Sequence, residues 1–193
     1  KTVEVYPAPF TKFGVGNVCM NDATQFLDSS ISAVNWNWSF GDGNTSVVTN
    51  PVHVFGKDTI YSVQLVTKNV FGCTDTSRKQ VTIHSLPVAN FGQDARCFVD
   101  SVHFTDLSLV NAPYTVNSWS WNLGDGNLSG TQNPVHSYNN PDTNYNVSLV
   151  VTTDFGCKDT FTDFIRVLPG PLADFSYGKI CIPDTSSFID ESK

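Results

Sequence analysis

The sequence predicts an all-β protein made of tandem β-sandwiches, each with two packed sheets. The composition favours strands, because Thr and Val are frequent whereas Lys, Glu, Leu and Ala are scarce. No segment shows the 3.6-residue periodicity of an amphipathic helix. An ordered set of strand and turn signals occurs twice, with about seven short strands in each copy. This pattern is typical of immunoglobulin-like sandwiches, which we expect to be stacked end to end.

Each copy is centred on a strand that ends in a tight turn. Segment 36–43 reads Trp-Asn-Trp-Ser-Phe-Gly-Asp-Gly, and segment 119–126 reads Trp-Ser-Trp-Asn-Leu-Gly-Asp-Gly. Residues two apart in a strand point to one face, so these large apolar side chains predict a core strand. Glycine and aspartate then favour a turn. The expected core residues are Trp38, Phe40, Trp121 and Leu123, and the expected turn residues are Gly41, Asp42, Gly43, Gly124, Asp125 and Gly126.

An opening pattern, Pro-x3-Phe-x5-Cys-x6-Phe-x-Asp-x-Ser, occurs three times, at Pro9, Pro87 and Pro171. Fixed-period similarity of this kind indicates a repeat protein. The units expected on this basis are the last strand of a preceding repeat at 1–8, whole repeats at 9–86 and 87–170, and the opening of a further repeat at 171–193. We expect such a chain to be an excerpt from a longer array.

The second half of each copy holds a strand that begins with tyrosine. Both copies contain Asn-Pro-Val-His and then Tyr-x-Val-x-Leu, at residues 50–53 and 61–65 and again at 133–136 and 145–149. The alternation of apolar residues predicts a half-buried strand. For Tyr61 and Tyr145 we expect a tyrosine corner, in which the hydroxyl bonds back to nearby backbone.

The tryptophan strand with its Gly-Asp-Gly turn, the Asn-Pro-x-His-x-Phe/Tyr segment and the Tyr-x-Val-x-Leu strand fall in this order twice, over nearly the whole chain. Together they resemble the PKD (polycystic kidney disease) domain family. The resemblance implies an immunoglobulin-like sandwich, an extracellular location, and spacer or adhesive roles without catalysis. The paired cysteines and the closing proline are similar to those of PKD arrays in large secreted surface proteins of Bacteroidota, often exported by the type IX system. Leu123 stands where the family usually has Phe, which is a conservative apolar change.

Some PKD domains beside secreted bacterial proteases bind calcium through an acidic Asp-x-Asp-Gly loop before the tryptophan strand. The corresponding segments here, 28–32 and 106–110, lack the second acidic residue. Calcium takes six or more oxygen ligands. We therefore expect no cofactor, with calcium at this loop as the alternative.

Several residues near the turn are candidates for chemistry. Asp42 and Asp125 could be acids or metal ligands, but a turn residue that accepts backbone N–H bonds is the expected role. His53 and His136 supply one imidazole per copy, whereas a metal site needs three or four converging ligands. We expect turn or buried hydrogen bonding for both histidines.

The remaining signals argue against an enzyme. Trp36 and Trp119 could form a sugar-stacking platform, but their parity with the core tryptophans favours burial. The sequence has no glycine-rich phosphate loop, no serine elbow and no Cys–His pair at a useful spacing. We therefore expect no catalytic residue.

Five cysteines predict disulfides in a secreted array. Pairing within repeats would give Cys19–Cys73 and Cys97–Cys157 and would leave Cys181 without a partner. In an immunoglobulin-like sandwich these positions lie at opposite ends of strands about 20 Å long, whereas a disulfide tolerates a Cα separation of roughly 7 Å. A bond across the junction, Cys19–Cys157, is the alternative, and the sequence leaves both pairings open.

The net charge limits the classes of partner that we expect. A net charge of −7 and a pI near 4.8 argue against nucleic acid and anionic membrane surfaces. No apolar run reaches the ~18 residues of a membrane span, so we expect no membrane insertion. The expected partners are neighbouring repeats, other surface proteins or glycans, at the cell surface or outside the cell. Segments around Thr59 and Ser101 also resemble a short O-glycosylation sequence of Bacteroidota.

Tandem repetition without a reactive site favours a structural role. We expect a semi-rigid stalk or filament segment of a large bacterial surface or adhesion protein, because the linker between Ile83 and Phe91 is short and contains Pro87. The alternative is a polysaccharide- or protein-binding accessory module of a secreted enzyme.

Overall fold

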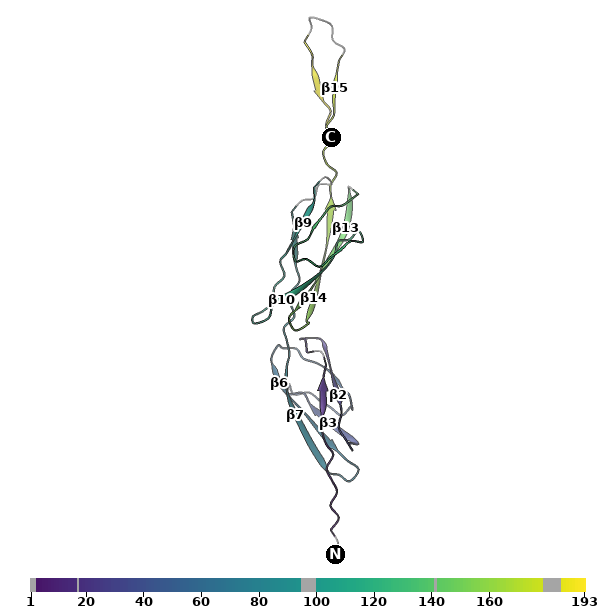
Figure 1. Cartoon of the computed structure of the whole chain (residues 1–193), viewed down its shortest axis with the longest axis vertical. Coiled ribbons are helices and arrows are strands. Elements are labelled where there is room, and N and C mark those ends of the chain that lie inside the picture. The colour runs from purple at the N-terminus through teal and green to yellow at the C-terminus, as the bar shows by residue number, and fades with distance from the viewer. Residues whose placement is uncertain (1–2, 17, 95–99, 141, 179–184) are drawn as a thin grey trace. The chain divides into compact units, whose positions relative to one another are not determined.

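The computed structural model describes residues 3–16, 18–94, 100–140, 142–178 and 185–193. Cys97 and Cys181 lie outside these residues. The described part of the chain contains β-strands and no α-helix, so the all-β prediction is confirmed (Figure 1). In the same part of the chain, nothing has the length and apolarity of a membrane-spanning helix.

The chain divides into two compact units. The first comprises Lys1–Val88, Leu109–Asn117 and Thr152–Asp159, and the second comprises Ala89–Ser108, Ser118–Val151 and Thr160–Lys193. Leu109–Asn117 and Thr152–Asp159 thus pack with the first unit although they come from the later half of the sequence.

The first sandwich consists of a three-stranded and a four-stranded sheet. The three-stranded sheet has the order β1 (Phe13–Val15), β2 (Ala23–Asp28), β5 (Val52–Val54). The four-stranded sheet has the order β4 (Thr45–Ser46), β3 (Asn35–Ser39), β6 (Ile60–Lys68), β7 (Thr74–Thr82). This division is that of an immunoglobulin-like sandwich.

The same topology recurs in the second repeat. One sheet has the order β12 (Val135–His136), β9 (Val102–Asp106), β8 (Phe91–Gln93). The other has the order β11 (Leu128–Ser129), β10 (Val116–Asn122), β13 (Thr143–Thr153), β14 (Lys158–Val167). The registers also match, because Phe13 faces Asp28 in the first repeat as Phe91 faces Asp106 in the second.

A tryptophan lies at the centre of each core. Trp38 is 0% exposed and its ring contacts those of Phe13 and Phe26, while Trp121 is 1% exposed and contacts Phe91. Removing a buried aromatic side chain of this size costs about 3–5 kcal/mol. The first core consists of Phe13, Phe26, Trp38, Phe40, Phe55, Val63, Leu65, Val81 and Ile83.

The two ends of the sequence differ from the whole repeats. Val3 and Val5 are not in a strand, and both residues are more than four-fifths exposed. The assignment of residues 1–8 to the last strand of a preceding repeat stays a prediction. At the other end, β15 (Phe175–Tyr177) pairs with β16 (Phe188–Asp190) in the register of β1 with β2. This hairpin is the start of the repeat pattern without its core.

Candidate functional site

The turn after the tryptophan strand needs glycine at its first position in both repeats. Gly41 has a φ of +85° and Gly124 has a φ of +84°. Residues with a side chain rarely adopt such positive φ values. A Cβ atom at Gly41 would lie 2.9 Å from the carbonyl oxygen of Ser62, and one at Gly124 would lie 2.8 Å from that of Asn146. The neighbouring strand therefore approaches too closely for a side chain at either position.

The aspartate of the first turn binds its own loop and a histidine. Asp42 accepts hydrogen bonds from the backbone N–H and the side-chain amide of Asn44, both at 3.0 Å. Its Oδ2 lies 2.6 Å from Nε2 of His53. Burial alone would raise the pKa of Asp42, but the hydrogen bonds from Asn44 and His53 outweigh burial and lower the pKa below its ordinary value. Asp42 is therefore an ionised turn residue with a histidine donor.

The second turn repeats this arrangement. Asp125 accepts bonds from the Asn127 backbone at 3.1 Å and side chain at 3.0 Å, and it lies 2.7 Å from Nε2 of His136. Over the described ranges, no three His, Cys, Asp or Glu side chains gather as they would around a metal ion. Each Asp–His pair lies in a separate repeat and is completed by loop hydrogen bonds, so it fixes the turn.

The first tryptophan of each strand is half-buried and bonded to a carboxylate that the sequence did not connect with it. The indole N–H of Trp36 donates to Asp28 at 2.8 Å, and that of Trp119 donates to Asp106 at 2.7 Å. These aspartates belong to the segments considered for calcium. Because the Asp-x-Ser pattern precedes the tryptophan in both copies, its repetition was the available signal. The core indoles of Trp38 and Trp121 instead donate to backbone carbonyls.

The tyrosine hydroxyls bond to backbone a few residues upstream in both repeats. The hydroxyl of Tyr61 donates to the Lys57 carbonyl at 3.4 Å, and that of Tyr145 donates to the Asn140 carbonyl at 3.1 Å. This is the geometry of a tyrosine corner, which fixes the chain reversal before the long strand.

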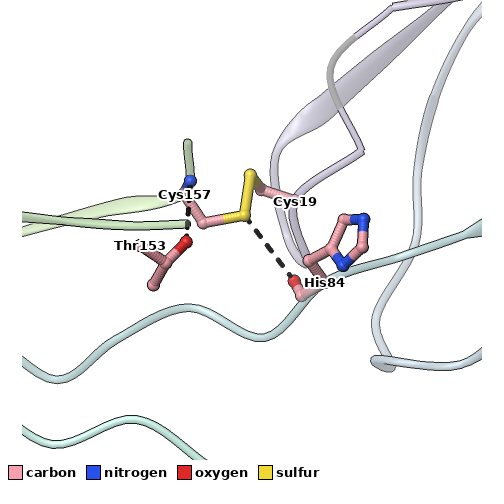
Figure 2. Close-up of a disulfide and its surroundings, with 4 residues drawn as sticks. All are labelled: Cys19, His84, Thr153 and Cys157. Carbon is pink, nitrogen blue, oxygen red and sulfur yellow. Dashed lines mark hydrogen bonds between the residues drawn. A yellow bond between two sulfur atoms is a disulfide. The ribbon is translucent and has the colours of Figure 1, made fainter. Parts of the chain in front are cut away.

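A disulfide joins cysteines of the two repeats (Figure 2). Of the two pairings that the sequence left open, the structure contains Cys19–Cys157, with a Cα separation of 5.6 Å across 138 positions of sequence. Both cysteines belong to the first compact unit, and their side chains are buried. Thr153 fixes the second cysteine by accepting its backbone N–H at 3.1 Å. The within-repeat pairings, Cys19–Cys73 and Cys97–Cys157, are therefore wrong, because Cys19 and Cys157 are bonded to each other.

Three rings pack together on segments next to this disulfide in the chain or in backbone pairing. The ring of His84 stacks on Phe155 with centroids 3.9 Å apart, and Tyr114 packs edge-on against both rings. The backbone of His84 bonds to residues on either side of Cys19, donating to Val18 at 2.8 Å and accepting from Met20 at 2.9 Å. The sulfur of Cys157 lies 4.0 Å from the His84 carbonyl oxygen, which is a contact only, because a disulfide sulfur carries no proton.

Three other candidates take no part in this arrangement. Cys73 is unpaired and half-exposed. Thr59 is exposed, and the hydroxyl of Ser101 lies 2.9 Å from that of Ser137. Glycosylation at Thr59 and Ser101 stays a prediction.

The repeated strand, turn and tyrosine corner have a counterpart among known domains. The profile of the PKD domain family matches residues 7–83 and again residues 84–167. The chain belongs to the PKD domain family. PKD domains are non-catalytic modules, and the disulfide and the two Asp–His turns lie within two consecutive PKD domains.

Curated relatives share one PKD-sized segment with this chain. Over 73 residues it is 37% identical to Collagenase ColA of Bacillus cereus, a match covering 35% of this chain and 8% of that protein. Over 49 residues it is 43% identical to Microbial collagenase of Vibrio alginolyticus, covering 25% of this chain and 6% of that protein. The chain thus spans less than a tenth of the length of these relatives. An origin in Bacteroidota stays a prediction.

A solved PKD domain is also similar. The PKD1 domain of Vibrio anguillarum Epp is 31% identical, with a TM-score of 0.41, and the alignment covers 45% of this chain and 99% of that one.

Proposed function

We propose that the two PKD domains form a semi-rigid spacer segment in an extracellular stalk of a larger protein. The observation that carries this proposal is the Cys19–Cys157 disulfide, which joins consecutive PKD domains that are also joined by the backbone. A second covalent connection removes conformational freedom that a single linker would leave.

The linker itself supports the same proposal. Ile83 is 0% exposed in the first core and Phe91 is 5% exposed in the second, and Pro87 between them is also buried. Proline restricts φ, and buried ends leave few residues free to bend. A spacer needs this limited freedom, and it needs no reactive site.

Small-angle X-ray scattering of the oxidised chain tests the spacer. We expect a narrow distribution of dimensions for the wild-type chain and a broader one for Cys19→Ser, because only the backbone then joins the domains. Cys73→Ser is the matched control, since Cys73 is not in the bond, and it should scatter as the wild-type chain does. Freely jointed domains in the wild-type chain would overturn the proposal.

The location we propose follows from redox chemistry. Disulfides persist in oxidising compartments outside the cytoplasm and are rare within it. A buried disulfide that connects two domains therefore supports an extracellular or cell-surface protein. There the stalk would hold a terminal domain away from the surface, and other surface proteins or glycans would be its contacts.

A second candidate function is an accessory module that holds substrate for a neighbouring enzyme. It is favoured by the matches to collagenases. Sedimentation with insoluble collagen tests it: a binding module should be depleted from the supernatant, whereas a spacer should stay in solution. Half-buried Trp36 and Trp119 are the aromatic residues to substitute if binding is found, with circular dichroism as the control for folding.

A further inference from the structure

The first repeat carries a copy of the hairpin that holds Cys157. In that copy, the N–H of Asn69 donates to the Cys73 carbonyl at 3.0 Å, as the N–H of Thr153 donates to the Cys157 carbonyl at 2.8 Å. The first side chain also caps the cysteine in both: the N–H of Cys73 donates to Asn69 Oδ1 at 3.0 Å, and that of Cys157 donates to Thr153 Oγ1 at 3.1 Å. The two cysteines therefore lie in hairpins that have the same pattern of hydrogen bonds.

The surroundings of the two sulfurs match as well. Phe71 stacks on Tyr6 with centroids 4.0 Å apart and planes 7° apart, whereas Phe155 stacks on His84 at 3.9 Å and 12°. Tyr6 and His84 occupy the same place in the repeat, three residues before its opening proline. The sulfur of Cys73 lies 3.6 Å from the Tyr6 carbonyl oxygen, as that of Cys157 lies 4.0 Å from the His84 carbonyl oxygen.

One component is missing at the first hairpin. The His84 backbone pairs with the segment that carries Cys19, and His84 is 8% exposed. Tyr6 is 42% exposed, and no described segment pairs with its backbone in this way. The hairpin of Cys73 is thus half of a disulfide site that the same structure shows complete at Cys157.

We propose that Cys73 forms a disulfide with the cysteine at the Cys19 position of another PKD domain, one that precedes this domain in the same polypeptide. The inference rests on the proposed function, because it extends the same crosslink along an array. It applies to Cys73 the pairing observed for Cys157.

The choice of partner follows from chain continuity. At the complete site, His84 directly follows Val81-x-Ile83, which fills the core of the domain that supplies Cys19. Tyr6 follows Val3-x-Val5 in the same register, so this segment is the end of the domain that would supply the partner cysteine. Because the partner is continuous with Tyr6, it belongs to the same polypeptide and not to a second copy of the chain.

The bond forms by ordinary thiol–disulfide exchange. The two thiols lose two protons and two electrons, one S–S bond forms, and an oxidant disulfide of the thiol–disulfide oxidoreductase class is reduced to two thiols. Oxidised glutathione can serve as that oxidant in solution, becoming two molecules of reduced glutathione.

A direct test is disulfide mapping of the natural polypeptide after free thiols are alkylated under non-reducing conditions. We expect Cys73 in a crosslinked peptide with a cysteine that aligns with Cys19 in the preceding domain. Alkylated Cys73, a bond to Cys97 or Cys181, or a bond to a second copy of the chain would each overturn the inference.

A second test separates this inference from the stalk proposal. Residues 9–86 are duplicated in tandem ahead of residue 9, and the chain is refolded with oxidised and reduced glutathione. Cys19 of the added domain should crosslink to Cys73 of the original one, which then loses its reactivity toward iodoacetamide. In the matched control the added domain carries Cys19→Ser, and Cys73 should stay reactive.

The original Cys19–Cys157 bond reports on folding in both duplicated chains. If that bond forms and Cys73 stays reactive beside an intact added Cys19, the inference fails whatever scattering shows of the spacer. If the crosslink forms in a chain whose domains scatter as freely jointed bodies, the stalk proposal fails and the pairing stands.

Discussion

The two sandwiches share one plan and fill one part of the core differently. In the first, the rings of Phe40 and Phe55 meet edge to face with centroids 6.5 Å apart. In the second, Leu123 and Tyr138 take these positions, and the Tyr138 hydroxyl donates to the Leu123 carbonyl at 2.8 Å. Burial, together with the nearby charge of Asp125, raises the pKa of Tyr138, so its hydroxyl stays a donor. The second core thus combines the smaller side chain of Leu123 with the added hydroxyl of Tyr138, and that hydroxyl has a hydrogen-bond acceptor.

What stays the same in the two repeats is the tryptophan, its turn and the Asp–His pair. The close approach of the backbone and the hydrogen-bond geometry at these positions allow few other residue types. The Phe40 and Phe55 positions depend on volume and on satisfying any buried polar atom, and several combinations of side chains meet that requirement.

The largest expected effect tests the shared centre. Trp38→Ala and Trp121→Ala should each destabilise their own sandwich by about 3–5 kcal/mol, because each removes a fully buried ring. Denaturant unfolding followed by circular dichroism should show one of two transitions moving in each variant. Equal losses would support equivalent cores, and a loss below about 1 kcal/mol at either site would contradict a central role for that tryptophan.

The next effect concerns the turn. Gly41→Ala and Gly124→Ala should each cost more than about 2 kcal/mol, because the added Cβ would meet backbone at a positive φ. Gly43 and Gly126 are matched controls: φ is +97° and +95° but the space around them is open. Their alanine variants should lose only about 1 kcal/mol. Equal thermal shifts at the first and second glycine of a turn would rule out the close approach.

A smaller effect tests the difference between the cores. Tyr138→Phe should cost about 1–2 kcal/mol, because the carbonyl of Leu123 loses its buried donor. The reciprocal change, Phe55→Tyr, places a hydroxyl beside Phe40 and should also destabilise. An unchanged unfolding midpoint in Tyr138→Phe would show that the hydrogen bond to the Leu123 carbonyl does not stabilise the second core.

The smallest effect lies in the acid limb of the stability curve. The folded-state pKa values of Asp42 and Asp125 are below the ordinary value of 3.8. Their contribution is therefore present above about pH 4 and is lost as pH falls through the folded pKa. Asp42→Asn should lower stability by less than about 1 kcal/mol at neutral pH, and its difference from wild type should shrink below pH 4. Exposed Asp163→Asn is the control, and a difference that grew with acid would contradict the assignment.

Most of the fold was predictable because its signals are local and repeated. The period-2 spacing of Trp36, Trp38 and Phe40 predicts a strand and its buried face, and the Gly-Asp-Gly run predicts the turn. The Asp42–His53 contact was less accessible, because it joins residues 11 positions apart in sequence through the packing of two sheets. Spacing alone does not show which side chains meet across a sandwich.

The disulfide lies at the limit of such reasoning. The expected positions of Cys19 and Cys73 at opposite ends of a strand argued against a bond between them. The sequence did not reveal how Cys157 is oriented toward Cys19. The packing of His84, Phe155 and Tyr114 was missed, because Tyr114 belongs to a loop that is five residues longer than its counterpart in the first repeat. The assignment of Val3 and Val5 to the last strand of a preceding repeat stays a prediction.

The disulfide also decides what happens when the chain is pulled from its ends. Tension that enters at Cys19 passes through the sulfur–sulfur bond to Cys157 and bypasses everything between them. The bypassed segment spans 138 positions, which as extended polypeptide would be roughly 450–500 Å long. As long as the bond is oxidised, that hidden length cannot be drawn out, and the segment resists stretching even if both sandwiches have melted.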